Sequence, residues 1–421
     1  MKKLFFLLLM IPLIGRGQQA GIHFENGLTW TEIQDKARAE HKYIFVDCFA
    51  TWCGPCKLMD REVYPLSSVG EFMNPHFISV KVQMDSSKQD DDYVKSWYKD
   101  AQAIKNAYNV YEFPTYLFLS AEGKIVHRGA AAVRDTDFLK LARNALNPAK
   151  QYYTLIEQYR AGRKNYEMMP YLANRSQEFH ADQLAGELAR DYIKNYLFHL
   201  SRQELFNTKN IGFVVSFTKT SKDPGFKLFM AYPGKIDSAV NRKLFAENFV
   251  ANIITKEDIN PRLYANNKPI VQKPQWKLLR SRISKKYGRS YAERTLLDAQ
   301  LQWYDAKNAW PEITRLYLLK LKRYGLDTSG VNWVINNNMI DDILGHCNDK
   351  NTLKKLLHWQ KIIVEGHPAN APSLDTYANL FYKTGDRQQA LEWERRAVAL
   401  DPKNTEIKTN LEKMEQGKPT W

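Results

Sequence analysis

The sequence has few of the residues that build cross-linked or repetitive proteins. Four cysteines, 20 glycines and 17 prolines occur among 421 residues. Four cysteines are too few for a disulfide-rich fold of this length. The low glycine and proline content excludes collagen-like and low-complexity chains. With 44% apolar and 25% charged residues, the chain is expected to form two or three domains held together by burial.

Long apolar runs are also scarce. The first run, residues 4–14 behind two lysines, has about 11 residues, whereas a membrane-spanning helix needs roughly 20. Residues 1–18 are predicted to be a cleaved secretory signal, because a basic start and an apolar centre are followed by small or polar residues near Gln18. An uncleaved membrane anchor is the alternative. We therefore expect a soluble exported protein, periplasmic if the source is a Gram-negative bacterium.

Acidic residues are outnumbered by basic ones in the second half of the chain. The net charge is +3 for residues 1–18, −1 for 19–150 and +13 for 151–421. The basic residues of the second half are scattered along helical patterns among acids, as solvated helix faces are. We expect no nucleic-acid partner for an exported protein; a docking surface for an acidic partner or an anionic envelope stays open.

Strand and helix patterns alternate in residues 19–148. Strands are predicted at 43–49, 77–84, 116–119 and 125–128, with a hairpin turn at 121–124. Helices are predicted from a Thr31 cap to about residue 40, just after Cys53, at 91–108 and at 135–146. This order predicts an α/β sheet with helices on both faces.

Residues 149–416 show helical patterns and almost no strand patterns. A shift of 34 residues superposes Asp341 on Asp375, Trp359 on Trp393 and Pro368 on Pro402. Such a period is typical of stacked helical hairpins. Residues 371–404 resemble a tetratricopeptide repeat, with 337–370 as a degenerate copy and 405–416 as a capping helix. Residues 149–336 are predicted to be helical and repeat-like without a clear period.

Two thiols lie three positions apart in Cys53-Gly54-Pro55-Cys56, directly after a predicted strand and at the start of a helix. The amide donors and the dipole of a helix N-terminus stabilise a thiolate there. Gly54 and Pro55 suit the turn into the helix, because proline lacks the amide hydrogen that the first turn leaves unpaired. Cys53 is the candidate nucleophile, and Cys56 is the candidate resolving thiol of a disulfide-exchange pair.

Zinc binding and a merely structural disulfide are the alternatives for this cysteine pair. Half of a zinc site would need a second pair of cysteine or histidine ligands, which Cys48 and Cys347 do not form. The nine histidines are dispersed, so we predict no metal. A structural disulfide that closes so small a loop would stabilise the fold little.

Residues 46–57, read as VDCFATWCGPCK, resemble the active-site strand and helix of thioredoxins. The resemblance covers about residues 28–148 and implies a thioredoxin fold, with a central sheet of four or five strands flanked by helices. No cofactor is implied beyond a redox-active Cys53–Cys56 disulfide.

The resemblance also implies roles for further residues. Asp47 matches a buried carboxylate that exchanges a proton with the resolving cysteine, and burial would raise its pKa. Lys81 resembles the lysine found beside that carboxylate. Pro114 resembles a cis-proline that faces the cysteine pair. Phe113 and Trp52 are then expected beside the substrate, together with Gly54, Pro55 and Pro114, and Trp52 is expected to shield the first sulfur.

Two features depart from a minimal thioredoxin. Residues 85–108 are longer and more acidic, and they more closely resemble exported thioredoxin-like domains of envelope reductases. Cys48 alternates with Asp47 in the strand, so we expect a buried side chain rather than a redox partner. Cys347 falls on Phe381 in the 34-residue alignment and is expected inside a packed helix.

The leading hypothesis is an exported thiol–disulfide oxidoreductase that acts on protein thiols or disulfides. The Gly-Pro dipeptide favours a reductase, which would need a membrane or envelope electron donor. The helical repeats would then position a protein partner. The alternative is an envelope binding scaffold, in which the repeats do the work and the thioredoxin-like domain serves for docking.

Overall fold

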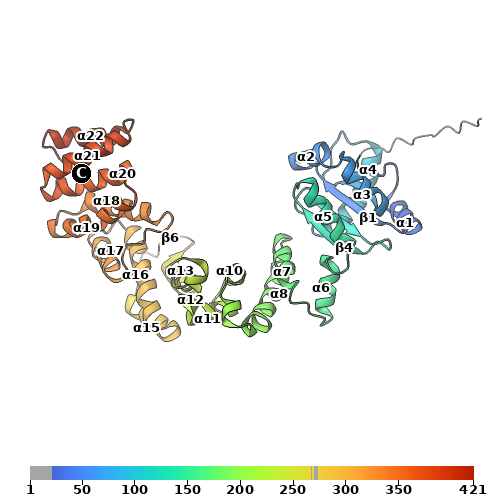
Figure 1. Ribbon diagram of the computed structural model, residues 1–421, viewed down its shortest axis with the longest axis horizontal. Helices are drawn as coiled ribbons and strands as arrows, with labels where there is room; N and C mark the ends of the chain where they lie inside the picture. The colour runs from blue at the N-terminus through green and yellow to red at the C-terminus, as the bar shows by residue number, and fades with distance from the viewer. Residues whose placement is uncertain (1–20, 267, 270–273) are drawn as a thin grey trace, which may run out of the picture. The chain divides into compact units, whose positions relative to one another are not determined.

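The computed structural model describes residues 21–266, 268–269 and 274–421. The predicted signal at 1–18 lies outside this range. The described chain divides into two compact units, one ending at His199 and the other covering Leu200–Trp421. The first unit is an α/β domain with a helical extension, and the second is almost entirely helical, so the predicted fold class is confirmed (Figure 1).

The first unit is built on one mixed sheet. Its strands are β1 (Tyr43–Phe49), β2 (Phe77–Gln83), β3 (Thr115–Leu119) and β4 (Ile125–Ala130), in the order β2-β1-β3-β4. The β1–β2 pair is parallel, and the other two pairs are antiparallel. β1 lies inside the sheet and is buried at five consecutive positions, which explains its nearly continuous apolar sequence.

Helices cover both faces of this sheet. The alternate strand residues Ile44, Val46 and Cys48 pack against α1 (Trp30–Glu40) and α4 (Asp92–Ala107). The intervening residue Phe45 packs with Tyr116 against α2 (Gly54–Glu62), α3 (Ser67–His76) and α5 (Asp135–Ala145). Asp47 therefore belongs to the face covered by α2, because side chains alternate along a strand.

Two local predictions in this domain were wrong. Thr29, and not Thr31, caps α1, since its side chain and that of Glu32 form a reciprocal capping box. Helix α3 was missed: its N-cap residue, Leu66, forms no side-chain cap hydrogen bond, and Pro75 lies inside the helix, so the sequence offered no capping residue and carried a helix-breaking one.

The helical extension of the first unit packs on the edge strand β4. The buried ring of His127 accepts a hydrogen bond at Nδ1 from the backbone nitrogen of Tyr152, at 3.0 Å. Burial lowers the pKa of His127 to about 3, so the ring is neutral and has a lone pair to accept with. The guanidinium of Arg128 lies 4.2 Å from the Phe179 ring centre. These contacts explain why the first unit continues beyond residue 148, where a domain end was expected, to His199.

The extension consists of α6 (Tyr152–Arg160), α7 (Met169–Glu178), α8 (Asp182–Asn195) and the short helix η1 (Leu197–His199). The second unit begins with α9 (Arg202–Leu205), α10 (Thr208–Ser216), α11 (Pro224–Ala231), α12 (Pro233–Val240), α13 (Phe245–Ile254), the π-helical turn η2 (Thr255–Ile259) and α14 (Asn260–Leu263). A two-stranded sheet follows, β5 (Tyr264–Ala265) with β6 (Lys268–Pro269). This small sheet was not predicted.

The last eight helices are α15 (Trp276–Tyr287), α16 (Arg289–Asp305), α17 (Trp310–Tyr324), α18 (Asn332–His346), α19 (Lys350–Gly366), α20 (Ala371–Thr384), α21 (Arg387–Leu400) and α22 (Thr405–Glu415). Consecutive helices pack on each other from α15 to α22, and α20 also packs on α18 and α22. Cys347 lies at the C-terminal cap of α18 and is half-buried. Its predicted place inside a helix was wrong, because the 34-residue alignment drifts by a few positions at that helix end.

A buried carboxyl group lies in α21, near the end of the chain. Glu394 in α21 lies 34 positions after Gln360 in α19, and both side chains are fully buried. Burial, together with the neighbouring Asp375, raises the pKa of Glu394 to about 10. The carboxyl group is therefore protonated at neutral pH and resembles the neutral amide at the earlier position.

We predict that Glu394→Gln stabilises the protein increasingly as pH rises. Folded Glu394 keeps a proton that the unfolded chain releases above its ordinary pKa, so its contribution to stability is full below about pH 4.5 and is lost as pH rises toward 10. Urea unfolding at pH 6 and pH 9 should show a gain for the variant that is larger at pH 9. The exposed Glu392→Gln in the same helix is the control, and an equal gain at both pH values would contradict the prediction.

Candidate functional site

The cysteine pair lies where β1 passes into α2. β1 ends at Phe49, a short loop follows, and Cys53 is the N-terminal cap of α2, with Pro55 in the first turn. Cys53 and Cys56 are joined by a disulfide, with their Cα atoms 5.3 Å apart. The sequence predicted both the helix start and the closeness of the two sulfurs.

The helix N-terminus donates a hydrogen bond to the first sulfur. The backbone nitrogen of Cys56 lies 3.0 Å from Sγ of Cys53. When the disulfide is reduced, the same donor and the positive end of the helix dipole favour the Cys53 thiolate over the thiol. Cys53 is therefore placed to act as the nucleophile of a disulfide exchange.

The surface around the disulfide is apolar and partly open. Cys53 and Cys56 are 2% and 3% exposed, and they pack with Ala50 under the half-buried Phe113. Trp52 is 70% exposed and lies edge-to-face with Phe113, at 5.8 Å between ring centres. An incoming segment of polypeptide can thus meet aromatic surface beside the sulfurs.

The loop before β3 carries the other candidate contacts. The Phe113–Pro114 peptide bond is cis, as the resemblance predicted. The Pro114 carbonyl accepts a hydrogen bond from the nitrogen of Ala131 at the end of β4. Gly54 and Pro55, in the first turn of α2, are exposed. Tyr111, two residues before Phe113 in the same loop, is 69% exposed.

Asp47 is a buried carboxyl in the middle of the sheet. It is 1% exposed and pairs in register with Lys81 of β2 and with Tyr116 of β3. Its Oδ1 atom has no hydrogen-bond partner among the described residues. Burial raises the pKa of Asp47 to about 7, and the Lys81 ammonium offsets only part of this rise. A carboxyl with such a pKa can accept and return a proton at neutral pH.

Lys81 lies close to Asp47 but is paired with another carboxylate. Its Nζ is 4.0 Å from Oδ2 of Asp47 and makes a closer ion pair with Asp60. Asp60 follows Cys56 by one helical turn on α2. Sequence reasoning missed Asp60, because its spacing of four from Cys56 places it on that helix face but does not reveal which strand residue it meets.

The two remaining cysteines, Cys48 and Cys347, form no disulfide. Cys48 is fully buried on the opposite face of the sheet, among residues packed under α1 and α4. Burial, with Asp47 adding to it, raises the pKa of the Cys48 thiol well above its usual value. Cys347 belongs to the second unit.

In residues 21–266, 268–269 and 274–421 no three histidine, cysteine, aspartate or glutamate side chains are grouped so that they could hold a metal ion. The same residues contain no helix long and apolar enough to cross a membrane.

Known proteins resemble the first unit of the chain. Residues 31–146 match the model of a family described as a thioredoxin-like domain. Thioredoxin H-type 2 of Nicotiana tabacum is 30% identical over 119 residues, which are 28% of this chain and 83% of that protein. Thioredoxin-2 of Pyricularia oryzae is 30% identical over 97 residues, 23% of this chain, and the chain spans 46% of its length.

A solved structure also resembles this unit. It is the solution structure of a putative disulphide-isomerase from Bacteroides thetaiotaomicron, which is 31% identical. The match covers 30% of this chain and 95% of that one, with a TM-score of 0.26.

We predict that Asp47→Asn stabilises the disulfide-bonded protein above acid pH. Between about pH 4 and pH 7 folded Asp47 keeps a proton that the unfolded chain releases, so its contribution to stability falls as pH rises. In that range the contribution of Asp47 to the free energy of unfolding falls by about 1.4 kcal/mol per pH unit. The gain of the variant in urea unfolding should grow by roughly 3 kcal/mol from pH 4 to pH 7.

The exposed Asp35→Asn on α1 is the control for this measurement, since its side chain is 61% exposed. Its free energy of unfolding should follow that of the wild type at each pH. A gain for Asp47→Asn that stays constant with pH would show that Asp47 is not held protonated by the fold.

Proposed function

The chain belongs to the thioredoxin-like family through its first unit, and from this premise we propose that it is a thiol–disulfide oxidoreductase acting on protein substrates. The observation that carries the proposal is the Cys53–Cys56 disulfide at the N-terminus of α2, next to the exposed Trp52, on the helix that covers the sheet face of the buried Asp47 carboxyl. Those groups supply a nucleophile, a resolving thiol, a base and a contact surface.

The proposed reaction transfers two electrons to a substrate disulfide. The Cys53 thiolate attacks one substrate sulfur; the substrate S–S bond breaks, a mixed disulfide forms, and the other substrate sulfur leaves as a thiolate that takes up a proton. Asp47 accepts the proton of the Cys56 thiol, and the Cys56 thiolate attacks Sγ of Cys53. The second substrate thiolate is released and protonated, and Cys53 and Cys56 are left as a disulfide.

We propose the reducing direction, because Gly-Pro between the cysteines is the dipeptide of reducing thioredoxins. Each turnover then consumes one external dithiol, which reduces the Cys53–Cys56 disulfide by the same exchange in reverse. No other cofactor is needed for this cycle. The predicted signal at residues 1–18 supports an exported, periplasmic protein, whose dithiol would come from a membrane or envelope donor.

The helical second unit is proposed to hold a protein partner. Its 34-residue spacing and its stacked helices support tetratricopeptide-like repeats at 337–416. Stacked helical pairs form extended surfaces that suit polypeptide binding. Such a unit would select which proteins reach the disulfide.

We predict that the protein accelerates the reduction of insulin disulfides by dithiothreitol, and that Cys53→Ser abolishes the acceleration. The variant lacks the attacking sulfur, so its rate should fall to that of dithiothreitol alone. Cys347→Ser is the matched control, because it removes a free thiol from the second unit and should keep the wild-type rate. Equal rates for wild type and Cys53→Ser would favour the scaffold alternative.

We further predict that Cys56→Ser traps substrates as mixed disulfides on Cys53. Without the resolving thiol the intermediate persists, and a shift in mass that dithiothreitol reverses should appear on a non-reducing gel. A variant with serine at both positions is the control and should form no covalent adduct. Trapping at Cys347 instead of Cys53 would contradict the proposed order of attack.

A further inference from the structure

The Lys81 ammonium has two carboxylates within reach and is held by the outer one. Nζ forms its close ion pair with Asp60 of α2 and stays 4.0 Å from Oδ2 of Asp47. The Asp60 side chain is 42% exposed, that of Lys81 is 27% exposed and that of Asp47 only 2%. The cation therefore lies between a buried carboxyl and a carboxylate at the surface.

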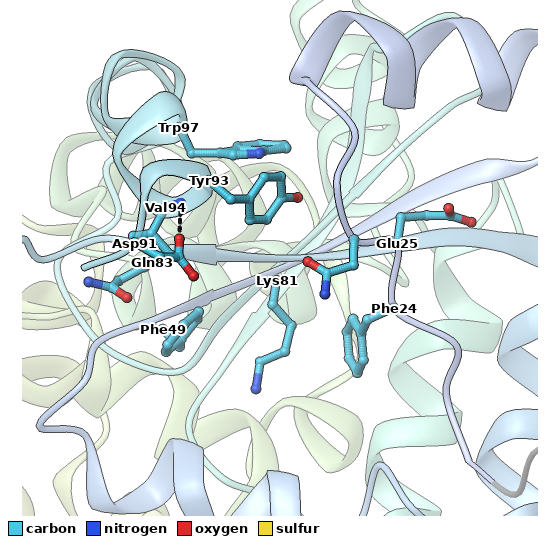
Figure 2. A pocket seen from close by; sticks show the side chains of 10 residues that line it. Phe24, Glu25, Phe49, Lys81, Gln83, Asp91, Tyr93, Val94 and Trp97 are labelled. Carbon is cyan, nitrogen blue, oxygen red and sulfur yellow. Dashed lines mark hydrogen bonds between the residues drawn. The ribbon is translucent and has the colours of Figure 1, made fainter. Parts of the chain in front are cut away.

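Aromatic rings line the position of this ammonium. Nζ lies 4.9 Å from the ring centre of Phe49, 5.7 Å from that of Phe24 and 5.8 Å from that of Tyr64. Figure 2 shows the Lys81 side chain running between Phe49 and Phe24. These three residues line one side of a cavity of about 280 Å³, and residues of α4 line its other side. The rings attract the cation and limit where it can lie.

The ionisable groups that face Asp47 come from three elements. β2 supplies Lys81, β3 supplies the phenol of Tyr116, and α2 with the residues after it supplies Asp60 and the phenol of Tyr64. Burial raises the pKa of both phenols above the ordinary value, so both are neutral. The charge felt by Asp47 thus depends on where Asp60 holds the Lys81 ammonium.

We propose that Asp60 is a positioning residue of the disulfide-exchange site: it keeps the Lys81 ammonium at the surface end of the site, so that the buried Asp47 carboxyl can hold a proton and give it up. A lysine that paired fully with Asp47 would lower the pKa of that carboxyl and leave a weaker base, which could no longer hold the proton taken from Cys56. Asp60 lies on the same helix as Cys56, so one helix holds both the thiols and the carboxylate that positions Lys81. This inference rests on the proposed function.

The test is the titration of the Asp47 carboxyl carbon, followed by NMR in the disulfide-bonded full chain. Asp60→Asn removes the competing carboxylate, so Lys81 can turn to Asp47. The pKa of Asp47 should fall by about one unit, a tenfold change in its acid dissociation constant. Asp60→Glu should restore the wild-type midpoint.

Glu62→Gln is the matched control. Glu62 is exposed on the same helix, is paired with Arg61 and carries the same charge. Its removal should leave the Asp47 midpoint within experimental error of the wild type. If Asp60→Asn does not fold, Asp60→Ser removes the same carboxylate and gives the same measurement.

A double-mutant cycle with Lys81→Met separates positioning from the direct repulsion between Asp60 and Asp47. If Asp60 acts through Lys81, Asp60→Asn should shift the midpoint clearly less in the Lys81→Met background than in the wild type. An equal shift in both backgrounds, or no shift in the wild type, would overturn the proposal. The titration needs no substrate, so its result does not depend on whether the protein reduces insulin.

Discussion

The structure of the site depends on the burial of one ionisable side chain. Asp47 occupies a central strand, under the helix that begins at Cys53, and has only a partial ion pair to offset its loss of water. A carboxyl in this position resists ionisation, since charge is costly where water is excluded. In the proposed disulfide exchange a proton leaves one sulfur and another sulfur takes one up, and a carboxyl balanced between its two protonation states is suited to both steps.

Much of the site could be predicted from one short segment. Strand residues 43–49, the turn at Gly54 and Pro55 and the helix after Cys53 follow from local pattern, and the positions of Asp47 and Pro114 follow from the resemblance. The Asp60–Lys81 pair could not be found in this way. It depends on a residue of α2 meeting a residue of β2, and no periodicity in the sequence reports which helix face meets which strand.

The helical part shows a similar division between local pattern and tertiary contact. Caps such as Asn370, Asp386 and Asn404 mark helix starts that the sequence signals directly. The end of the first unit could not be read from sequence, because it depends on Tyr152 meeting a buried histidine on an edge strand. The β5–β6 pair has only two residues in each strand, too few to produce an alternating pattern.

The contact between α6 and β4 also has a mechanical meaning. His127 and Arg128, which hold the helical extension, are separated by only a few residues from Ala131, whose nitrogen bonds the Pro114 carbonyl. β4 thus contacts the helical extension through His127 in its middle, and Ala131, directly after its last residue, donates the hydrogen bond to the proline loop. A displacement of α6 would therefore act, through β4 and the hydrogen bond to the Pro114 carbonyl, on the loop whose Phe113 packs against the sulfurs.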